Sequence, residues 1–265
     1  MARNKYKGKL IVLEGLDGTG KATQTKMLMD YLVNVKGLEY GKDVIDVDFP
    51  RYKKPSATMV EHYLSGKFGN DPDTINPYVA SSFYTIDRAI SYNTEEWGEV
   101  YRNGGLVIAD RYTISNIIHQ GAKIVQNGLG GLADDDDIDY DSTLIEFIRW
   151  LTRYEYNYSN IPCPTAVIVL TMDKKCNEKL IRDRKDNAVE GDIHESNIEY
   201  LDRCRFVLDK YKNLTDYSFM MGSIHSKNFF VTTNDENGDL YSREKIAEDI
   251  RKIVDSVIEM EVSDD

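Results

Sequence analysis

The sequence predicts an α/β fold with a mostly parallel five-stranded sheet and helices on both faces. Short apolar runs alternate along the chain with longer segments whose apolar residues recur at helical spacing. The first apolar run leads through a glycine-rich turn directly into a helical segment. No internal repeat or linker interrupts this alternation, so we expect residues 1–265 to form one domain.

The first strand, loop and helix have the layout of a phosphate-binding loop. The apolar run from Leu10 to Leu13 is followed by glycines at positions 15, 18 and 20, and then by Lys21. Such glycines let backbone N–H groups point inward, while the positive end of the following helix faces the same space. The lysine adds a mobile charge for the outer phosphates. This stretch therefore predicts a cradle for a nucleotide triphosphate, the alternative being a glycine-rich turn without a ligand.

The remaining elements follow from the same patterns. Further strands are expected, in chain order, over Asp43 to Phe49, Leu106 to Asp110, Ala166 to Thr171 and Phe229 to Thr233. The helices expected in chain order are Lys21 to Val35, Ser56 to Gly66, Asn76 to Arg102, Ser142 to Tyr156, Asp173 to Asp186, Ser196 to Leu214 and Ser242 to Met260. Asn76 and Pro77 make a favourable helix start, and Ser196 with Glu199 forms a capping box.

Charged residues follow several of these strands. Arg51 comes after the second strand, and Asp110 with Arg111 ends the third. Ligands of open α/β sheets bind at the carboxyl edge of the strands. We therefore expect these residues to lie beside the glycine loop.

Two polar stretches interrupt the pattern. Residues 128–141 contain four consecutive aspartates, which indicate a solvated insertion more readily than a cation site. Arg182, Arg184 and Lys185 precede the polar segment from Asp186 to Asp192, which predicts a lid over about 182–195, the alternative being a solvated helix end.

The composition limits the class of partner and compartment. The formal net charge of −12 argues against a nucleic acid ligand, because such binding requires clustered Lys and Arg. No apolar run approaches a membrane span, and the segment after the basic N-terminus is too short for a signal peptide. The three cysteines match no metal or redox pattern. We expect a cytoplasmic protein that binds neither membrane nor nucleic acid.

The combination of a glycine cradle with cations from several segments suits phosphoryl transfer. That reaction requires positioning and charge neutralisation more than covalent chemistry from the protein. This positive charge can come from Lys21, Arg51, Arg111 and the cluster of Arg182, Arg184 and Lys185.

With these segments together, the sequence resembles the thymidylate kinase family of P-loop nucleoside monophosphate kinases. The matching stretches occur in the order typical of the family: Gly15 to Gln24, Phe49 to Tyr52, Phe83 to Arg88, Asp110 to Asn116 with Gln120 to Ala122, and Asp192 to Glu195 leading to Tyr200, Leu201 and Tyr211. The resemblance implies a P-loop kinase fold with a small lid, and ATP-dependent phosphorylation of dTMP to dTDP.

The resemblance also implies roles for the acceptor-binding residues. The residue matching Asp17 faces the sugar 3′-hydroxyl, and Arg51 would hold the acceptor phosphate. The Tyr84 ring would stack on the base, to which Arg88 would hydrogen-bond. Three further residues match positions lining the base and sugar pocket: Ser115, Asn116 and Gln120.

For ATP and magnesium the resemblance implies a second group. ATP would contact the loop residues Gly15, Gly18, Thr19, Gly20, Lys21, Ala22 and Thr23. Arg111 would bridge the phosphates, while Asp110 would act near Mg²⁺ and the acceptor phosphate. Because Gly18 stands where other members carry a basic residue, the catalytic arginine is expected from the lid, at Arg182 or Arg184. The resemblance further implies a homodimer.

Three departures from the family pattern bear on these expectations. Ala22 lacks the hydroxyl that normally contacts magnesium, and His119 replaces a tyrosine near the deoxyribose. Residues 128–141 and 215–226 are expected to be insertions. A kinase of another deoxynucleoside monophosphate, such as dUMP or dGMP, is the alternative function, because base choice depends on few contacts. A further alternative function, suggested by Ala22, is a nucleotide-binding module without catalysis.

Overall fold

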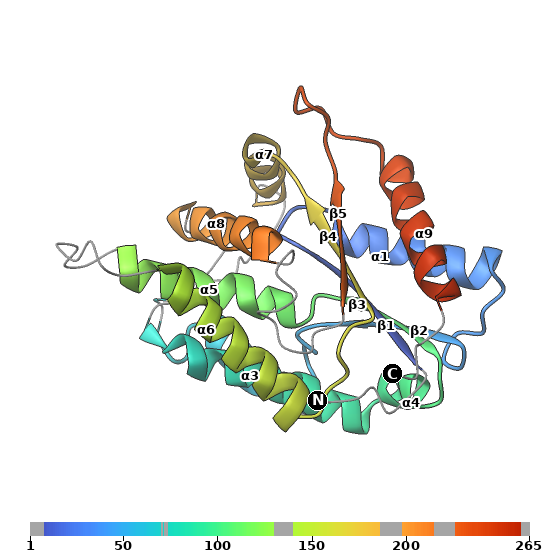
Figure 1. Ribbon diagram of the computed structural model, residues 1–265, viewed down its shortest axis with the longest axis horizontal. Coiled ribbons are helices and arrows are strands. Elements are labelled where there is room, and N and C mark those ends of the chain that lie inside the picture. The colour runs from blue at the N-terminus through green and yellow to red at the C-terminus, as the bar shows by residue number, and fades with distance from the viewer. Residues whose placement is uncertain are drawn as a thin grey trace.

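The fold consists of one five-stranded sheet with helices on both faces (Figure 1). The computed structural model describes residues 8–69, 71, 74–129, 140–185, 198–214 and 226–260. The strand order is β2-β3-β1-β4-β5, and all four pairs are parallel. The strands are β1 (Lys9–Gly15), β2 (Val44–Asp48), β3 (Leu106–Asp110), β4 (Ala166–Thr171) and β5 (Lys227–Thr232). The predicted α/β class and the five strands are thus confirmed.

Helices account for most of the remaining described residues. In chain order they are α1 (Lys21–Asp30), α2 (Thr58–Leu64), α3 (Pro77–Thr94), α4 (Glu96–Arg102), α5 (Thr113–Leu129), α6 (Tyr140–Thr152), α7 (Lys174–Lys185), α8 (Ile198–Leu214) and α9 (Arg243–Glu259). Two helices continue as π-helical segments, α1 over Tyr31–Val35 and α6 over Arg153–Tyr158. The side chain of Asn76 accepts the N–H of Tyr78 at the start of α3, as its sequence predicts.

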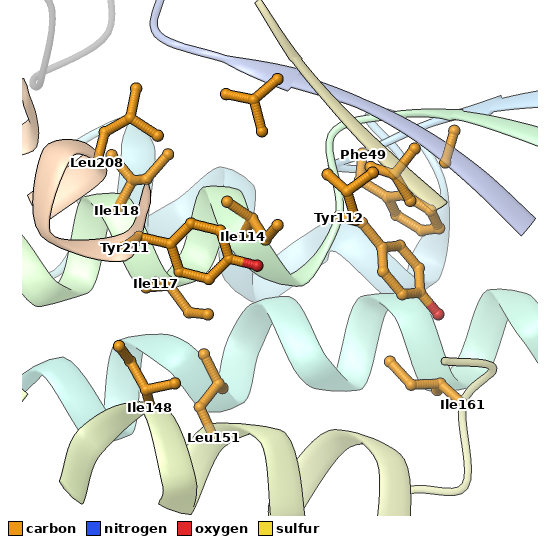
Figure 2. Close-up of a cluster of buried hydrophobic side chains, with 14 of the residues drawn as sticks. Phe49, Tyr112, Ile114, Ile117, Ile118, Ile148, Leu151, Ile161, Leu208 and Tyr211 are labelled. Atoms are coloured by element: carbon orange, nitrogen blue, oxygen red, sulfur yellow. The ribbon is translucent and has the colours of Figure 1, made fainter. Parts of the chain in front are cut away.

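Each face of the sheet is covered by different helices. α1 and α9 pack on one face, where Leu28 and Val254 meet strand residues such as Ile11. Helices α3, α5, α6 and α8 cover the other face. In Figure 2, Ile117 of α5, Leu151 of α6 and Tyr211 of α8 lie in this second cluster. Because β1 is central and buried on both faces, the loop that follows it is held on a rigid strand.

The prediction of a single helix from Asn76 to Arg102 is wrong. The backbone at Glu95 is extended, with φ −110° and ψ 161°, which separates α3 from α4. The break lets Trp97 turn into the core, where its ring packs edge-on against Phe49 at 5.8 Å. Tertiary packing of a large aromatic side chain overrides the local helical pattern here.

Some expectations concern residues outside the described ranges. Most of the lid over 182–195 and of the two insertions, 128–141 and 215–226, lies there, and so these stay predictions, as does the single domain over 1–265. No helix in the described ranges is both long enough and apolar enough to cross a membrane.

Candidate functional site

The loop between β1 and α1 forms the floor of the site. Gly15 has φ 145°, and a Cβ there would lie 2.6 Å from the carbonyl oxygen of Leu170 on β4. Gly20 has φ 89° and immediately precedes α1. Both positions therefore need glycine, the first for lack of space and the second for its left-handed backbone. The loop brings the N-terminus of α1 to the carboxyl edge of the sheet.

Lys21 is buried inside this loop. Its Nζ donates to the carbonyl oxygens of Gly15 at 2.8 Å and Leu16 at 2.9 Å. Burial, together with the charge of Arg111, lowers the pKa of Lys21 to about 8. The ammonium group thus holds the loop backbone and remains charged at neutral pH.

The other loop residues differ in exposure. The Thr19 hydroxyl is buried and donates to the Leu16 carbonyl oxygen at 2.8 Å, so it closes the turn around Gly18. Ala22 and Thr23, in the first turn of α1, are exposed. An exposed Ala22 leaves the position of the usual magnesium hydroxyl open to solvent.

Arg111 faces the loop from the end of β3. Its φ is 68°, a left-handed conformation that is unusual for a residue with a side chain. Its guanidinium is ion-paired with the carboxylate of Asp17. Burial acts to raise the pKa of Asp17, but the charges of Arg111 and Lys21 hold it well below its ordinary value. The two predicted residues are therefore side by side, with Asp17 ionised.

Asp110 ends β3 one residue earlier. It pairs in register with Asp48 of β2, so two carboxylates meet at the sheet edge. Burial raises the pKa of Asp110, although Lys21 and Arg111 act in the opposite direction. In the described part of the chain, no three Asp, Glu, His or Cys side chains gather as a metal-binding group.

Glu14, at the end of β1, hydrogen-bonds residues that follow β3, and the sequence did not predict this role. It is completely buried and accepts from the Tyr112 N–H at 2.7 Å. It also accepts from the N–H and the hydroxyl of Ser115, at 3.0 and 2.7 Å. Ser115 thus bonds Glu14 in this structure. A charged residue between the apolar run and Gly15 was the available signal.

Arg51 is held by carboxylates. Its guanidinium contacts Glu95 and Asp48, each at 2.6 Å, and its backbone N–H donates to Asp87 at 2.8 Å. Glu95 sits at the break between α3 and α4, which the sequence did not predict. Arg51 therefore lies at the carboxyl edge as expected, but paired with acids.

Arg88 lies inside the molecule on α3. Its side chain is 2% exposed and is ion-paired with Glu155, which has no exposure. The guanidinium carbon also lies 5.5 Å from the centroid of the Tyr112 ring. Tyr84, one turn away on α3, is half-buried and packs edge-on against Tyr63 at 6.4 Å. No local pattern around Glu155 marks it as the partner of Arg88.

Asn116 and Gln120 lie one turn apart on α5 and are both buried, with Asn116 beside this pair. The Nδ2 of Asn116 donates to the Ser81 carbonyl oxygen at 3.2 Å and lies 3.4 Å from Glu155. The Oδ1 of Asn116, both amide atoms of Gln120 and the Nε of Arg88 have no hydrogen-bond partner within the described residues. Buried polar atoms are rarely left in this state.

His119 packs between α5 and α8. Its Nδ1 lies 3.1 Å from the hydroxyl of Tyr200, on which the imidazole ring stacks. Burial lowers the pKa of His119 to about 4, and so the ring is neutral at neutral pH. Its neighbours are those of a structural histidine.

Helix α7 is attached to the loop. The Nδ2 of Asn177, which is 1% exposed, donates to the carbonyl oxygen of Asp17 at 2.5 Å, and its Oδ1 accepts from Arg205 of α8 at 3.0 Å. Arg182 and Arg184 lie further along α7, and their side chains are outside the described part. Sequence reasoning missed Asn177, because its partner is a backbone atom 160 residues away.

The sequence of this chain is similar to those of known thymidylate kinases. The family model described as thymidylate kinase matches residues 13–129, which include the loop, Arg51, Arg88 and Asp110. Thymidylate kinase from Mycobacterium tuberculosis (strain CDC 1551 / Oshkosh) is 25% identical over 197 residues, covering 73% of this chain and 81% of the relative.

Solved structures support the fold. Thymidylate kinase from Candida albicans superposes with a TM-score of 0.61 at 18% identity, covering 94% of this chain and 92% of the other. Thymidylate kinase from Ehrlichia chaffeensis gives a TM-score of 0.53 at 16% identity, with 93% and 98% covered. At such identities the likeness concerns the fold alone. The similarity of this chain to thymidylate kinases beyond the fold comes from the family match over residues 13–129 and from the relative in Mycobacterium tuberculosis.

Proposed function

We propose that this protein transfers the γ-phosphoryl group of ATP to the 5′-phosphate of dTMP, giving ADP and dTDP. The bond from the γ-phosphorus to the bridging oxygen of ADP breaks, and a new bond forms to an oxygen of the acceptor phosphate. Because the acceptor oxygen is already anionic, the protein mainly positions the two nucleotides and neutralises charge.

One observation carries the choice of acceptor. The Nε of Arg88, the Oδ1 of Asn116 and the amide of Gln120 are buried without partners within the described residues. Leaving a buried polar atom unpaired costs about 1–3 kcal/mol, so such a group is best explained by a ligand that pairs with it. Arg88 comes from α3, where the neighbouring Asp87 accepts from the N–H of Arg51, and the other two side chains come from α5.

The chemistry of these atoms fits a pyrimidine dione. Thymine presents two carbonyl oxygens, which accept, and one N3–H, which donates. Arg88 offers only donors, whereas the Oδ1 of Asn116 can accept the N3–H. Gln120 can serve either role. A base with an amino group at the position facing Arg88 would set donor against donor.

The donor nucleotide is assigned to the loop. The α- and β-phosphates would be bound by the N–H groups of residues 18–23, at the positive end of α1. Lys21, charged at neutral pH, would move from the carbonyl oxygens of Gly15 and Leu16 toward the outer phosphates. Arg111 would exchange Asp17 for phosphate oxygens between the two nucleotides.

Asp110 fits a role beside Mg²⁺. A magnesium ion in a kinase site is usually held by one or two carboxylates together with phosphates and water, so a full cage of protein ligands is not needed. The Asp110 carboxyl, whose pKa burial raises, would be stabilised as an anion by a nearby cation. When bound, Mg²⁺ would neutralise charge on the transferring phosphates.

The acceptor phosphate is assigned to Arg51. Its guanidinium already lies at the sheet edge, where Glu95 and Asp48 hold it. A phosphate would replace one of these carboxylates, which is favourable because Arg binds phosphate and carboxylate with the same planar fork. The deoxyribose would then lie near Asp17 and Tyr84.

We also propose a homodimer and a single domain over residues 1–265. Three apolar side chains of α3 are exposed on its outward face: Val79 at 49%, Ile86 at 41% and Ile90 at 45%. Their spacing places them along one side of the helix. A second copy of the chain would cover them, and light scattering coupled to gel filtration measures whether the particle has twice the mass of the chain.

The activity is tested by incubating the protein with ATP, Mg²⁺ and each of dTMP, dUMP, dCMP and dGMP, and separating the products. We expect dTDP as the main product and at most a tenth of that rate with dCMP or dGMP. Lys21→Ala serves as the inactive control, and its circular dichroism should match that of the wild type. A higher rate with dGMP than with dTMP would contradict the assignment of the acceptor.

A further inference from the structure

A buried ion pair lies beside the proposed base pocket. Arg88 of α3 and Glu155 are 2% and 0% exposed, and they are 67 residues apart in the sequence. Glu155 belongs to the π-helical segment Arg153–Tyr158 that continues α6. Such segments interrupt regular helices and are frequent at functional sites.

Stability does not explain this pair well. Both charges lose their hydration, and replacement of a buried ion pair by apolar residues is often neutral or stabilising. A pair kept at this cost needs another reason. The place of Arg88 at the proposed base site supplies one.

Glu155 is bonded by two helices in addition to Arg88. Its Oε1 accepts from the hydroxyl of Thr85 at 3.1 Å and lies 3.4 Å from the Nδ2 of Asn116. Its Oε2 accepts from the hydroxyl of Thr113 at 2.5 Å. The carboxylate therefore connects α3 and α5 at the depth where the base would bind.

These contacts also fix the direction of the guanidinium. Glu155 engages one terminal nitrogen of Arg88, and the Tyr112 ring packs against the group, with its centroid 5.5 Å from the guanidinium carbon. The Nε of Arg88 is left without a partner in the described part of the chain. The Nε–H donor is therefore available to a ligand while the terminal nitrogen is held by Glu155.

We propose that Glu155 is a positioning residue that sets base selectivity. By neutralising Arg88 and fixing its orientation, it directs the free N–H groups at a ring carbonyl of the acceptor base. It thereby favours a pyrimidine dione over a base that presents an amino group there. This inference rests on the proposed function, and it assigns to Glu155 a role that acts through Arg88.

The first test is Glu155→Gln, which keeps the size of the side chain and removes its charge. We expect the KM for dTMP to rise at least tenfold, with kcat and the KM for ATP changed less than twofold. The ratio of kcat/KM for dTMP to that for dCMP should fall at least fivefold, because the guanidinium is no longer held in one orientation. A residue with only a structural role would not separate the two KM values.

Thr152→Val is the matched control. Thr152 is also buried at the end of α6, but its hydroxyl donates only to carbonyl oxygens of its own helix, at Ile148 and Arg149. Its substitution should leave the KM for dTMP and the selectivity ratio within twofold of the wild type. A rise in this KM as large as that of Glu155→Gln would show that any change at the end of α6 disturbs the pocket, and would overturn the proposal.

Thr85→Val provides a second variant that buries no unpaired charge. It removes one hydrogen bond to Glu155 and conserves the shape of the side chain, so it tests the same point if Glu155→Gln does not fold. We expect the KM for dTMP to rise at least threefold, again without a change for ATP. An unchanged KM for dTMP in the folded variants, with only a lower melting temperature, would make the pair purely structural.

Wild-type turnover separates the two hypotheses. If the wild type phosphorylates dTMP but Glu155→Gln keeps its KM and selectivity, the role of Glu155 alone is wrong. If the wild type phosphorylates none of the deoxynucleoside monophosphates, the proposed function fails, and the role of Glu155 fails with it.

Discussion

The carboxylate of Asp17 and the guanidinium of Arg111 form an ion pair across the mouth of the glycine loop. Asp17 lies within the loop, and Arg111 directly follows β3 in a left-handed conformation with φ 68°. Such a backbone costs about 1–3 kcal/mol and persists where the surrounding structure fixes it. The pair therefore holds the guanidinium of Arg111 between the proposed donor and acceptor sites. Phosphate oxygens can displace the Asp17 carboxylate from Arg111.

The pKa of Lys21 predicts how ATP use depends on pH. Because this pKa is lowered to about 8, Lys21 of the free enzyme is charged below pH 8 and loses its charge above it. We expect kcat/KM for ATP to fall as pH rises through about 8, approaching about tenfold per pH unit, since this parameter reports the free enzyme. Bound phosphates favour the charged lysine, so kcat should fall only at higher pH. A kcat/KM that stays flat up to pH 10 would contradict this prediction.

Replacement of Arg88 should affect both stability and acceptor binding. Arg88→Met leaves Glu155 buried without its counter-ion, and breaking such a pair costs about 3–5 kcal/mol. We expect this loss in urea unfolding, together with a rise in the KM for dTMP that is far larger than any rise for ATP. Arg102→Met is the control, because that guanidinium packs on Tyr92 away from the site. Equal effects on both substrates would place Arg88 elsewhere in the mechanism.

Ala22→Ser tests the departure from the usual loop. Ala22 is exposed in the first turn of α1, so a hydroxyl can be added there without disturbing the core. We expect a lower magnesium concentration for half-maximal rate, with the choice among acceptors unchanged, because the new oxygen can contact the ion or its water. Thr23→Ser, one residue further along α1, keeps a hydroxyl at its own position and serves as the control for the magnesium dependence. An unchanged magnesium dependence would mean that water already occupies this position.

The two arginines of α7 should differ in their contribution to catalysis. They are two residues apart in the sequence of one helix. Because residues two apart do not share a helix face, we expect only one of them to reach the transferring phosphoryl group. One of Arg182→Ala and Arg184→Ala should lower kcat by about 10³ or more with little change in the KM for dTMP, while the other is mild. If each variant loses less than about tenfold, Arg111 becomes the better candidate for that role.

Much of the site was determined by short stretches of sequence. The apolar run of β1, the glycines that require special backbone conformations and the basic residue that follows them specify the loop within a dozen positions. Parallel strands then bring Asp110 and the segment of Arg51 to the same edge. These features are local, or follow from the alternation of strands and helices, and they can therefore be predicted from the sequence alone.

The partners of the charged side chains were decided only by the tertiary structure. Arg88 meets Glu155, Arg51 meets Glu95, and Asn177 meets the backbone of Asp17, across 67, 44 and 160 residues. The break at Glu95 brings Trp97 of α4 against Phe49, and the π-helical segment after α6 carries Glu155 to Arg88 of α3. The sequence by itself determines the glycine loop and the charged residues at the ends of the strands, because glycines and apolar runs act on the backbone nearby. Which acid neutralises each arginine depends on how distant helices pack, since electrostatic pairing follows distance in space.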